Sequence, residues 1–416
     1  MARHPGAVTT GAESLSATPR FPLTRGVALL FAVACGTAVA NVYFAQPLLV
    51  TLGRDFSIGT ATVGAVVSLT QLGYGLGLFF LVPLGDLLDR RRLVVGQLLL
   101  LAAALAAVGT ADNVALLLVG LAAVGSLAVV TQTLVAFAAS LAPSAARGRA
   151  VGLVTSGVVT GILLARTVSG LLADLAGWRS VYLSSAAVAC VLALTLHRLL
   201  PSGVSAAPAA GGYGRLLRST VTLFVRERLL RLRALFALLI FAAFSALWSS
   251  VALPLSAPPL SLSHTEIGAF GLAGAAGALA ATAAGRLNDR GFSQRTTGIG
   301  LALLTVSWLP LALTRHSLWA LAAGVIVLDL AVQAVHVTNQ TLIYALHPEA
   351  GSRLIGGYMV FYSIGSASGA VTATALYAVA GWTAVCALGA GFSSLALLLW
   401  ALTRRGTPNA PTAAAG

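Results

Sequence analysis

Residues 148–161, GRAVGLVTSGVVTG, are repeated 204 positions later by residues 352–365, SRLIGGYMVFYSIG. Gly161 matches Gly365, and each copy leads on to the same tripeptide, Ala-Gly-Trp. Repeats of half a chain's length are typical of membrane transporters, in which two similar halves enclose a central site. The repeat therefore predicts two halves of the same fold, inserted in the same orientation.

The composition indicates a membrane protein. Of the 416 residues, 58% are hydrophobic and only 9% are charged, whereas soluble domains carry roughly 25% charged residues. Apolar windows of about 20 residues, enough to cross a bilayer as a helix, recur along the chain. The windows are 26–50, 61–84, 93–111, 114–141, 150–173, 180–200, 234–255, 265–284, 297–314, 318–346, 355–379 and 383–403. They lack the alternation of a β-barrel. We therefore expect an all-α polytopic protein with twelve transmembrane helices in two pseudo-symmetric six-helix bundles.

The basic residues predict the orientation. All 25 are Arg, against 11 acidic residues, and they cluster in alternate loops instead of forming one basic face, which argues against nucleic acid as a partner. Only Arg54, Arg179 and Arg315 fall in the opposite set of loops, and Arg166 falls inside a span. The positive-inside rule then places both termini in the cytoplasm. We expect a multi-pass protein of a bacterial-type plasma (inner) membrane, with the lipid bilayer as its main partner.

The domain organisation follows from these windows. We expect a disordered cytoplasmic tail over 1–24, an N-terminal bundle over 25–200, a cytoplasmic linker over 201–233, a C-terminal bundle over 234–403 and a cytoplasmic tail over 404–416. An Arg- and Leu-rich stretch, 215–233, fits an amphipathic helix on the membrane surface, or a target for calmodulin or nucleic acid. The first apolar run also resembles a signal peptide ending at Ala38-Val39-Ala40, although it continues long enough to span. The three cysteines suit neither disulfides nor a metal site.

A loop motif occurs once in each half: GDLLDRRR from Gly85 and GRLNDRG from Gly285. The Gly allows neighbouring helix ends to approach closely, and the Asp can face the positive N-terminus of a helix while pairing with Arg. Both copies resemble the loop signature of the major facilitator superfamily. The stretches ANVYFAQPLL, from Ala40, and SLTQLGYGLGLFFLVPLGDLLDRRR, from Ser68, further resemble its arabinose-efflux-permease and drug:proton-antiporter branch.

The resemblance implies that this loop is a latch that stabilises one access state. The implied gating residues are Gly85, Asp89, Arg90, Gly285, Asp289 and Arg290. The alternative is a plain positively charged inside loop.

Two full charges fall at membrane depth, where ionisable side chains are costly and mark candidate functional sites: Arg166 in the fifth span and Asp329 in the tenth. Gln333, His336 and Gln340 share a helix face with Asp329. Proton coupling needs a group that changes charge, so Asp329, His336 and Arg166 are the candidates. We hypothesise that Arg166 and Asp329, at similar depth, pair across the halves in one access state. The alternatives are a static buried ion pair or two separately solvated groups.

The family resemblance implies that the first, fourth, seventh and tenth helices line the substrate cavity, and two tyrosines of the eleventh span join them. The candidate cavity residues are Asn41, Gln46, Gln132, Phe244, Trp248, Gln333, Gln340, Tyr358 and Tyr362. Aromatic rings with amides suit an uncharged or amphipathic solute. The alternative is that the aromatic face belongs to the core and that the amides bond neighbouring helices.

These features favour a secondary active transporter, a proton-coupled exporter of small organic molecules that works by alternating access. The alternative on the same scaffold is a proton-coupled uptake symporter for a sugar or organic acid. No catalytic motif or nucleotide-binding loop supports an enzyme, and the polar stripe from Asp329 argues against a non-transporting sensor. We expect no cofactor, the proton gradient as the energy source, a small-molecule substrate and a monomeric chain.

Overall fold

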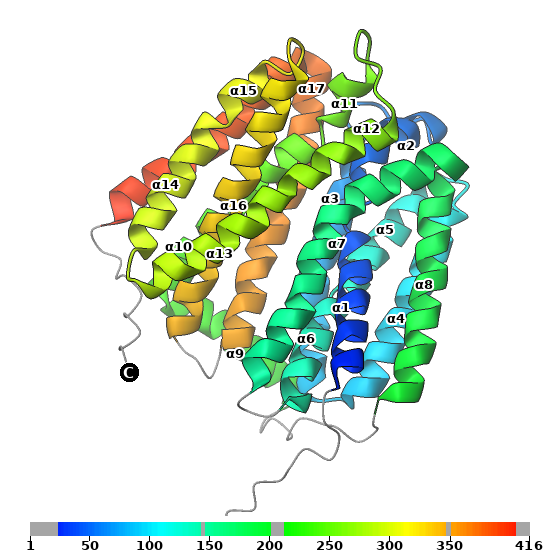
Figure 1. Cartoon of the computed structure of the whole chain (residues 1–416), viewed down its shortest axis with the longest axis vertical. Coiled ribbons are helices and arrows are strands. Elements are labelled where there is room, and N and C mark those ends of the chain that lie inside the picture. Colours follow the sequence, from blue (N-terminus) through cyan, green and yellow to red (C-terminus); the bar gives the residue numbers. More distant parts are fainter. Residues whose placement is uncertain (1–23, 143–145, 201–211, 347–350, 405–416) are drawn as a thin grey trace, which may run out of the picture.

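The computed structural model describes residues 24–142, 146–200, 212–346 and 351–404, and every regular element within them is helical (Figure 1). The elements of the first half are α1 (Arg25–Ala40), η1 (Gln46–Leu48), α2 (Leu49–Asp55), α3 (Gly64–Phe80), η2 (Val82–Asp86), α4 (Arg90–Gly109), α5 (Val114–Ala128), α6 (Val130–Leu141), α7 (Arg147–Ala176) and α8 (Trp178–Leu199). Three crossings of this half consist of more than one element: α1 continues through η1 into α2, α3 into η2, and α5 into α6.

The second half repeats this plan after a separate linker helix. Its elements are α9 (Gly212–Arg226), α10 (Arg228–Trp248), α11 (Ala252–Ser256), α12 (His264–Ala269), η4 (Phe270–Gly274), α13 (Ala275–Asp289), α14 (Ser293–Val306), α15 (Trp308–Ala312), α16 (Leu318–Leu346) and α17 (Gly351–Thr403). The linker helix α9 contacts both halves, through η2 on one side and through α10 and α17 on the other.

Twelve crossings result within the described residues. Eight helical segments are long and apolar enough to span a membrane, and one of them, within α17, is long enough for two crossings. Its backbone turns at Gly381, where φ is 72°. The remaining three crossings are broken into shorter helices: α1 with α2, α12 with α13, and α14 with α15. The predicted all-α, twelve-helix architecture is therefore confirmed.

The sequence repeat has a structural counterpart in helix packing. A Cβ at Gly161 of α7 would lie 2.2 Å from the carbonyl oxygen of Gly36 in α1, and one at Gly365 of α17 would lie 2.2 Å from that of Leu238 in α10. Only glycine permits backbones to approach this closely. The matching glycines thus hold the first and fifth crossings, and the seventh and eleventh, in the same arrangement.

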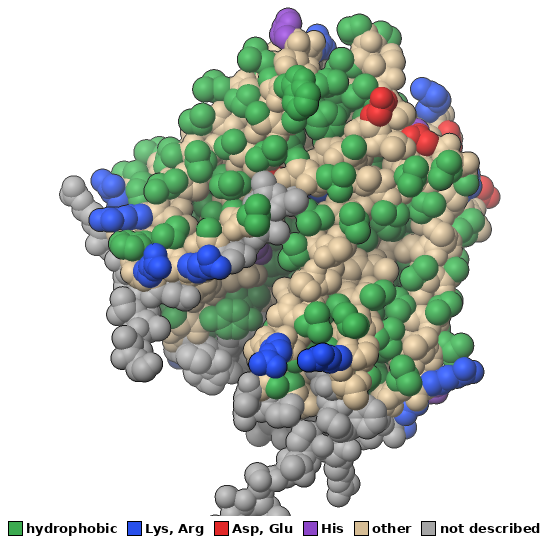
Figure 2. Space-filling view, in the orientation of Figure 1, with side chains coloured by type: hydrophobic (Ala, Val, Ile, Leu, Met, Phe, Trp, Pro, Cys, Tyr) green, Lys and Arg blue, Asp and Glu red, His purple; other side chains and the backbone are tan. Residues whose placement is uncertain are grey.

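The two ends of the molecule differ in charge. We call the end at which α1 and α4 begin, with Arg25 and Arg90, the Arg-rich end, and the other, with Asp55, Asp174 and Glu266, the acidic end. Figure 2 shows hydrophobic side chains covering the face between these ends, as expected for a surface against lipid. Residues 1–23 and 405–416 of the predicted tails and 201–211 of the predicted linker lie outside the described residues. Helix α10 begins at Arg228, six residues before the predicted start of the C-terminal bundle at residue 234.

Candidate functional site

Arg166 lies on α7 in the interior of the molecule, with only 2% of its surface exposed. Its Nε donates a hydrogen bond of 2.6 Å to Oε1 of Gln46, and its guanidinium carbon lies 3.8 Å from the centre of the Trp248 ring. The rings of Tyr43 and Phe244 are 5.1 and 5.6 Å away. Aromatic faces attract a cation, so this cage partly replaces the water that the guanidinium loses. Its Nη2 atom is buried without a protein partner.

Asp329 lies on α16, across the interface between the halves, and is 5% exposed. The indole Nε1 of Trp248 donates a hydrogen bond of 3.3 Å to its Oδ1. Arg166, Asp329, Phe244 and Gln333 line one cavity of about 70 Å³, which has room for water-sized groups only. One Trp ring thus contacts both buried charges.

The predicted partnership of Arg166 and Asp329 takes an indirect form. Both residues reach the same cavity, as their similar depth predicts, yet no N···O distance of 4.0 Å or less joins them within the described part of the chain. Trp248 connects the two instead, through its ring face and its N–H. Two opposite charges held apart in a buried site can respond to a proton or a solute, because neither is locked in a direct ion pair.

His336 continues the polar stripe of α16 toward the Arg-rich end. Its Nδ1 lies 2.8 Å from the Tyr358 hydroxyl, and its Nε2 lies 3.3 Å from the amide nitrogen of Gln340. An amide nitrogen can only donate, so Nε2 accepts and Nδ1–H donates to Tyr358. Asn339 donates to the same hydroxyl at 3.4 Å. The network lies within the second half and holds the imidazole in one neutral tautomer.

Aromatic residues join the halves next to this network. The hydroxyls of Tyr43, from the first crossing, and Tyr362, from the eleventh, are 2.8 Å apart. The Phe241 ring lies 4.1 Å from that of Tyr362 and 5.1 Å from that of His336, centre to centre. Sequence reasoning overlooked Tyr43, although it lies between Asn41 and Gln46, because no local pattern shows which ring of that segment turns toward the second half.

Two of the predicted cavity residues lie elsewhere. Asn41 is buried inside the first half, where its Oδ1 accepts a hydrogen bond of 2.7 Å from Ser185 of α8. Gln132 lines a second cavity, of about 400 Å³, nearer the Arg-rich end. This cavity lies between the halves and is lined also by Gly85, Arg90 and Gly357. The predicted cavity set is therefore divided among a central site, a cavity near the Arg-rich end and a helix contact.

The first copy of the loop motif forms a braced turn. Asp89 caps α4 by accepting a hydrogen bond of 2.9 Å from the backbone N–H of Arg92. Arg90 donates to the carbonyl oxygens of Gly85, at 3.3 Å, and Ala136, at 3.2 Å. The turn is thereby fastened to α6, as expected for a loop that holds helix ends together.

The close approach of helix ends expected at the motif glycines does not occur in this conformation. A Cβ at Gly85 would meet its nearest neighbour at 3.8 Å, and one at Gly285 would meet nothing within 4 Å. Close backbone approach occurs instead at mid-helix glycines such as Gly161, whose Cβ would lie 2.2 Å from the Gly36 carbonyl oxygen. Arg290 is exposed at the end of α13, and the side chain of Asp289 lies outside the described residues.

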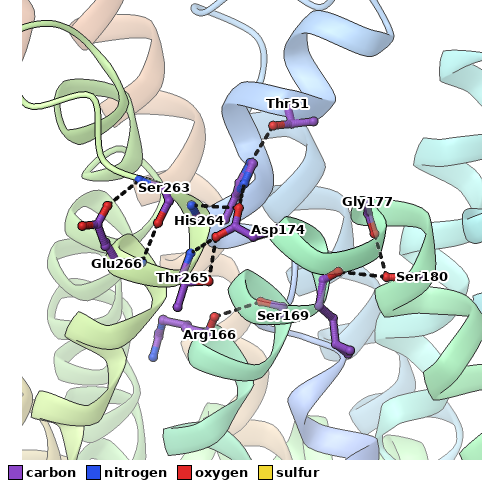
Figure 3. A network of polar contacts seen from close by, with 11 residues as sticks. Thr51, Arg166, Ser169, Asp174, Gly177, Ser180, Ser263, His264, Thr265 and Glu266 are labelled. Carbon is purple, nitrogen blue, oxygen red and sulfur yellow. Dashed lines mark hydrogen bonds and ion pairs between the residues drawn. The ribbon is translucent and has the colours of Figure 1, made fainter.

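Sequence reasoning missed two further groups. Arg233, counted among the loop arginines, is fully buried in α10, where its Nη1 donates to Thr297 and Asn339. Asp174 and His264 join the halves at the acidic end (Figure 3). Within the described residues, no cluster of three or more His, Cys, Asp or Glu side chains could hold a metal ion.

Two helical bundles enclosing a buried, charged and aromatic site between them define a membrane transporter. The family comparison agrees, because the model of the Major Facilitator Superfamily matches residues 29–257 and 234–416. The chain therefore belongs to the major facilitator superfamily.

Several relatives carry names of the same class. The chain is 46% identical over 382 residues to a putative uncharacterized transporter, YgaY, of Escherichia coli strain K12, covering 92% of this chain and 96% of that protein. It is 32% identical over 411 residues to a probable transporter, SCO4007, of Streptomyces coelicolor, covering 93% and 92% of the two chains.

Solved structures share the fold. A bacterial homologue of the human lysosomal transporter Spinster, in an inward-facing and occupied conformation, gives a TM-score of 0.72 at 15% identity, covering 92% of this chain and 97% of that one. The human organic anion transporter MFSD10 gives a TM-score of 0.64 at 19% identity, covering 91% and 100%.

Proposed function

We propose that this chain is a proton-coupled secondary transporter that exports small organic, amphipathic molecules by alternating access. The observation that carries the proposal is the pair of buried charges, Arg166 and Asp329, which line one cavity from opposite halves without forming a direct ion pair. A carboxylate in such a site can bind and release a proton as the halves move. The aromatic residues around it suit a solute with an apolar body.

The proposed orientation places the Arg-rich end in the cytoplasm, because most of the 25 arginines fall on that side and only Arg54, Arg179 and Arg315 fall in loops on the other. The cavity of about 400 Å³ then faces the cell interior, and the acidic end faces outward. Solute enters the cavity of about 400 Å³ from the cytoplasm, and the smaller cavity next to Trp248 widens to take it as the halves move. The solute then leaves on the other side. A proton moving inward through Asp329 supplies the energy.

The charge logic of antiport is simple. When Asp329 is ionised, its charge offsets that of Arg166 through Trp248, and the site is close to neutral. When Asp329 is protonated, the site carries the net positive charge of Arg166. This charge changes the affinity of the surrounding aromatic residues for a bound solute. Proton and solute thus compete for one site and use it in turn.

A second reading, proton-coupled uptake of an organic acid, is favoured by one observation. The Nη2 atom of Arg166 is buried without a protein partner, and a carboxylate is the group that suits a free guanidinium N–H. In that case the solute and the proton bind together instead of competing.

The direction of proton movement separates the two proposals. Purified protein is reconstituted into liposomes that enclose a pH-sensitive dye, and a panel of amphipathic cations, neutral compounds and organic acids is loaded in turn. Antiport predicts that a solute gradient in one direction drives protons in the other, whereas symport predicts proton movement with the solute. A solute gradient that moves solute without any proton movement would reject proton coupling in both forms.

A further inference from the structure

One carboxylate joins the halves at the acidic end. Asp174, near the end of α7, accepts four hydrogen bonds from the start of α12 (Figure 3). The backbone N–H and Nδ1 of His264 reach its Oδ1 at 3.3 and 2.6 Å, and the backbone N–H and hydroxyl of Thr265 reach its Oδ2 at 2.7 and 2.6 Å. A carboxylate offers about four acceptor positions, so the second half occupies all of them.

His264 extends the junction to a third segment. Its Nε2 lies 2.7 Å from the hydroxyl of Thr51 in α2. With Nδ1–H donating to Asp174, Nε2 accepts from the Thr51 hydroxyl, and both ring nitrogens are satisfied. A single side chain of the second half thus links two helices of the first half.

The backbones meet at the same place. A Cβ at Gly170 of α7 would lie 2.2 Å from the carbonyl oxygen of His264, and one at Gly268 of α12 would lie 2.3 Å from that of Arg166. Thr167 also donates a hydrogen bond of 3.0 Å to the Gly268 carbonyl. Glycines on both helices therefore permit a contact that any other residue would obstruct.

The junction covers the central site. A Cβ at Gly271 in η4, directly after α12, would come within 3.0 Å of the Arg166 side chain, and one at Gly274 would come within 3.0 Å of Asp329 Oδ2. The segment formed by α12 and η4 therefore runs from Asp174 to both buried charges. If α12 moved away from α7, this segment would uncover Arg166, whereas Asp329, in the same half as α12, would move with the segment.

We propose that Asp174, His264, Thr265 and Thr51 form the gate that holds the transporter closed at the acidic end, and that its release opens the Arg166–Asp329 site to that side. The proposal rests on the alternating-access cycle proposed above. The side chains of Asp174 and His264 are 28% and 29% exposed, so water replaces the broken bonds readily, as a gate that opens in every cycle requires.

The test measures the opening of that end directly. Spin labels are placed at Thr60→Cys, in the first half, and Arg315→Cys, in the second, both exposed at the acidic end. The background carries Cys190→Ser, because Cys190 is exposed whereas Cys35 and Cys386 are buried. Distances between the labels are recorded by electron–electron double resonance in lipid nanodiscs, with no solute and no proton gradient.

Asp174→Asn removes the negative charge and replaces one carboxylate oxygen with an amide NH₂, which cannot accept hydrogen bonds from His264 or Thr265. We expect the population at longer distance to rise at least threefold. The control is Asp55→Asn at the same end, which disrupts the contacts of Asp55 with Trp178 and Arg179 inside the first half and should leave the distances unchanged. An unchanged distribution in Asp174→Asn, or an equal shift in Asp55→Asn, would overturn the proposal.

A second pair of variants tests the gate independently, in case Asp174→Asn does not fold. Thr265→Val removes the hydroxyl donor and should also lengthen the distances, whereas Thr265→Ser keeps it and should not. Equal behaviour of these two variants would contradict the gate. The distance measurement needs neither solute nor a proton gradient, so it is independent of the transport assay. A shift in label distances with no proton coupling in liposomes would reject the proposed function alone. Proton coupling with no shift in label distances would reject the gate alone.

Discussion

At the residue scale, Trp248 is the group on which the central site depends. Its ring face lies against the Arg166 guanidinium, and its N–H is hydrogen-bonded to Asp329. An indole can do both at once because its face carries negative potential and its edge carries a donor. In the proposed mechanism, a change in the protonation of Asp329 would reach Arg166 through this one ring.

Trp248→Phe should separate these two roles. The ring under Arg166 remains, but the hydrogen bond to Asp329 is lost. Hydrogen bonds to charged groups contribute about 1.5–3 kcal/mol, so we expect proton-coupled flux to fall by about tenfold or more. The initial rate of flux in proteoliposomes measures this. Trp319→Phe is the matched control, because Trp319 is 86% exposed and should tolerate the change. Equal rates in the two variants would show that the indole N–H has no role.

At the element scale, glycines determine how the helices pack within each half. Gly161 and Gly365 occupy matching positions of the repeat, and each brings two helix backbones into direct contact. The close contact fixes the first crossing against the fifth and the seventh against the eleventh. Each bundle can then rock as a rigid body, which is what alternating access requires.

Gly161→Val should destabilise the first bundle. Its Cβ would overlap the Gly36 carbonyl, and overpacking of this kind costs about 1–3 kcal/mol. Thermal unfolding in detergent should show a Tm several degrees lower. Gly152→Ala on the same helix meets nothing within 4 Å and should leave the Tm unchanged or raise it. A Tm for Gly161→Val equal to that of the wild type would mean that the close contact between α1 and α7 contributes nothing to stability.

At the scale of the whole molecule, the sequence predicts the number and lengths of the membrane-spanning helices but not the contacts between the two halves. Span lengths follow from bilayer thickness, and α16, Leu318–Leu346, coincides with its predicted window. The shared depth of Arg166 and Asp329 also follows from counting along helices. By contrast, the Tyr43–Tyr362 contact joins residues 319 positions apart, and the Asp174–His264 contact depends on how two bundles meet. No local period encodes either one.

The way the halves and helices pack also explains why the structure places the predicted cavity residues in several different locations. Polar residues on helices expected to line the cavity are candidates by position, but a helix also turns polar groups toward its neighbours. Asn41 is hydrogen-bonded to Ser185, while Gln46, five residues further along the same crossing, is hydrogen-bonded to Arg166. The break between α1 and η1 turns the chain between these two residues, and nothing in the sequence pattern fixes the angle of that turn.

The most direct measurement is proton flux driven by solute in proteoliposomes of the wild type, Asp329→Asn and Asp112→Asn. Asp112 is an exposed carboxylate in the loop between α4 and α5, so its variant controls for the loss of one charge. If Asp329 carries the coupling proton, Asp329→Asn loses coupled proton flux by at least tenfold while still exchanging solute for solute, and Asp112→Asn matches the wild type. Proton flux at the wild-type rate in Asp329→Asn would contradict the proposed mechanism.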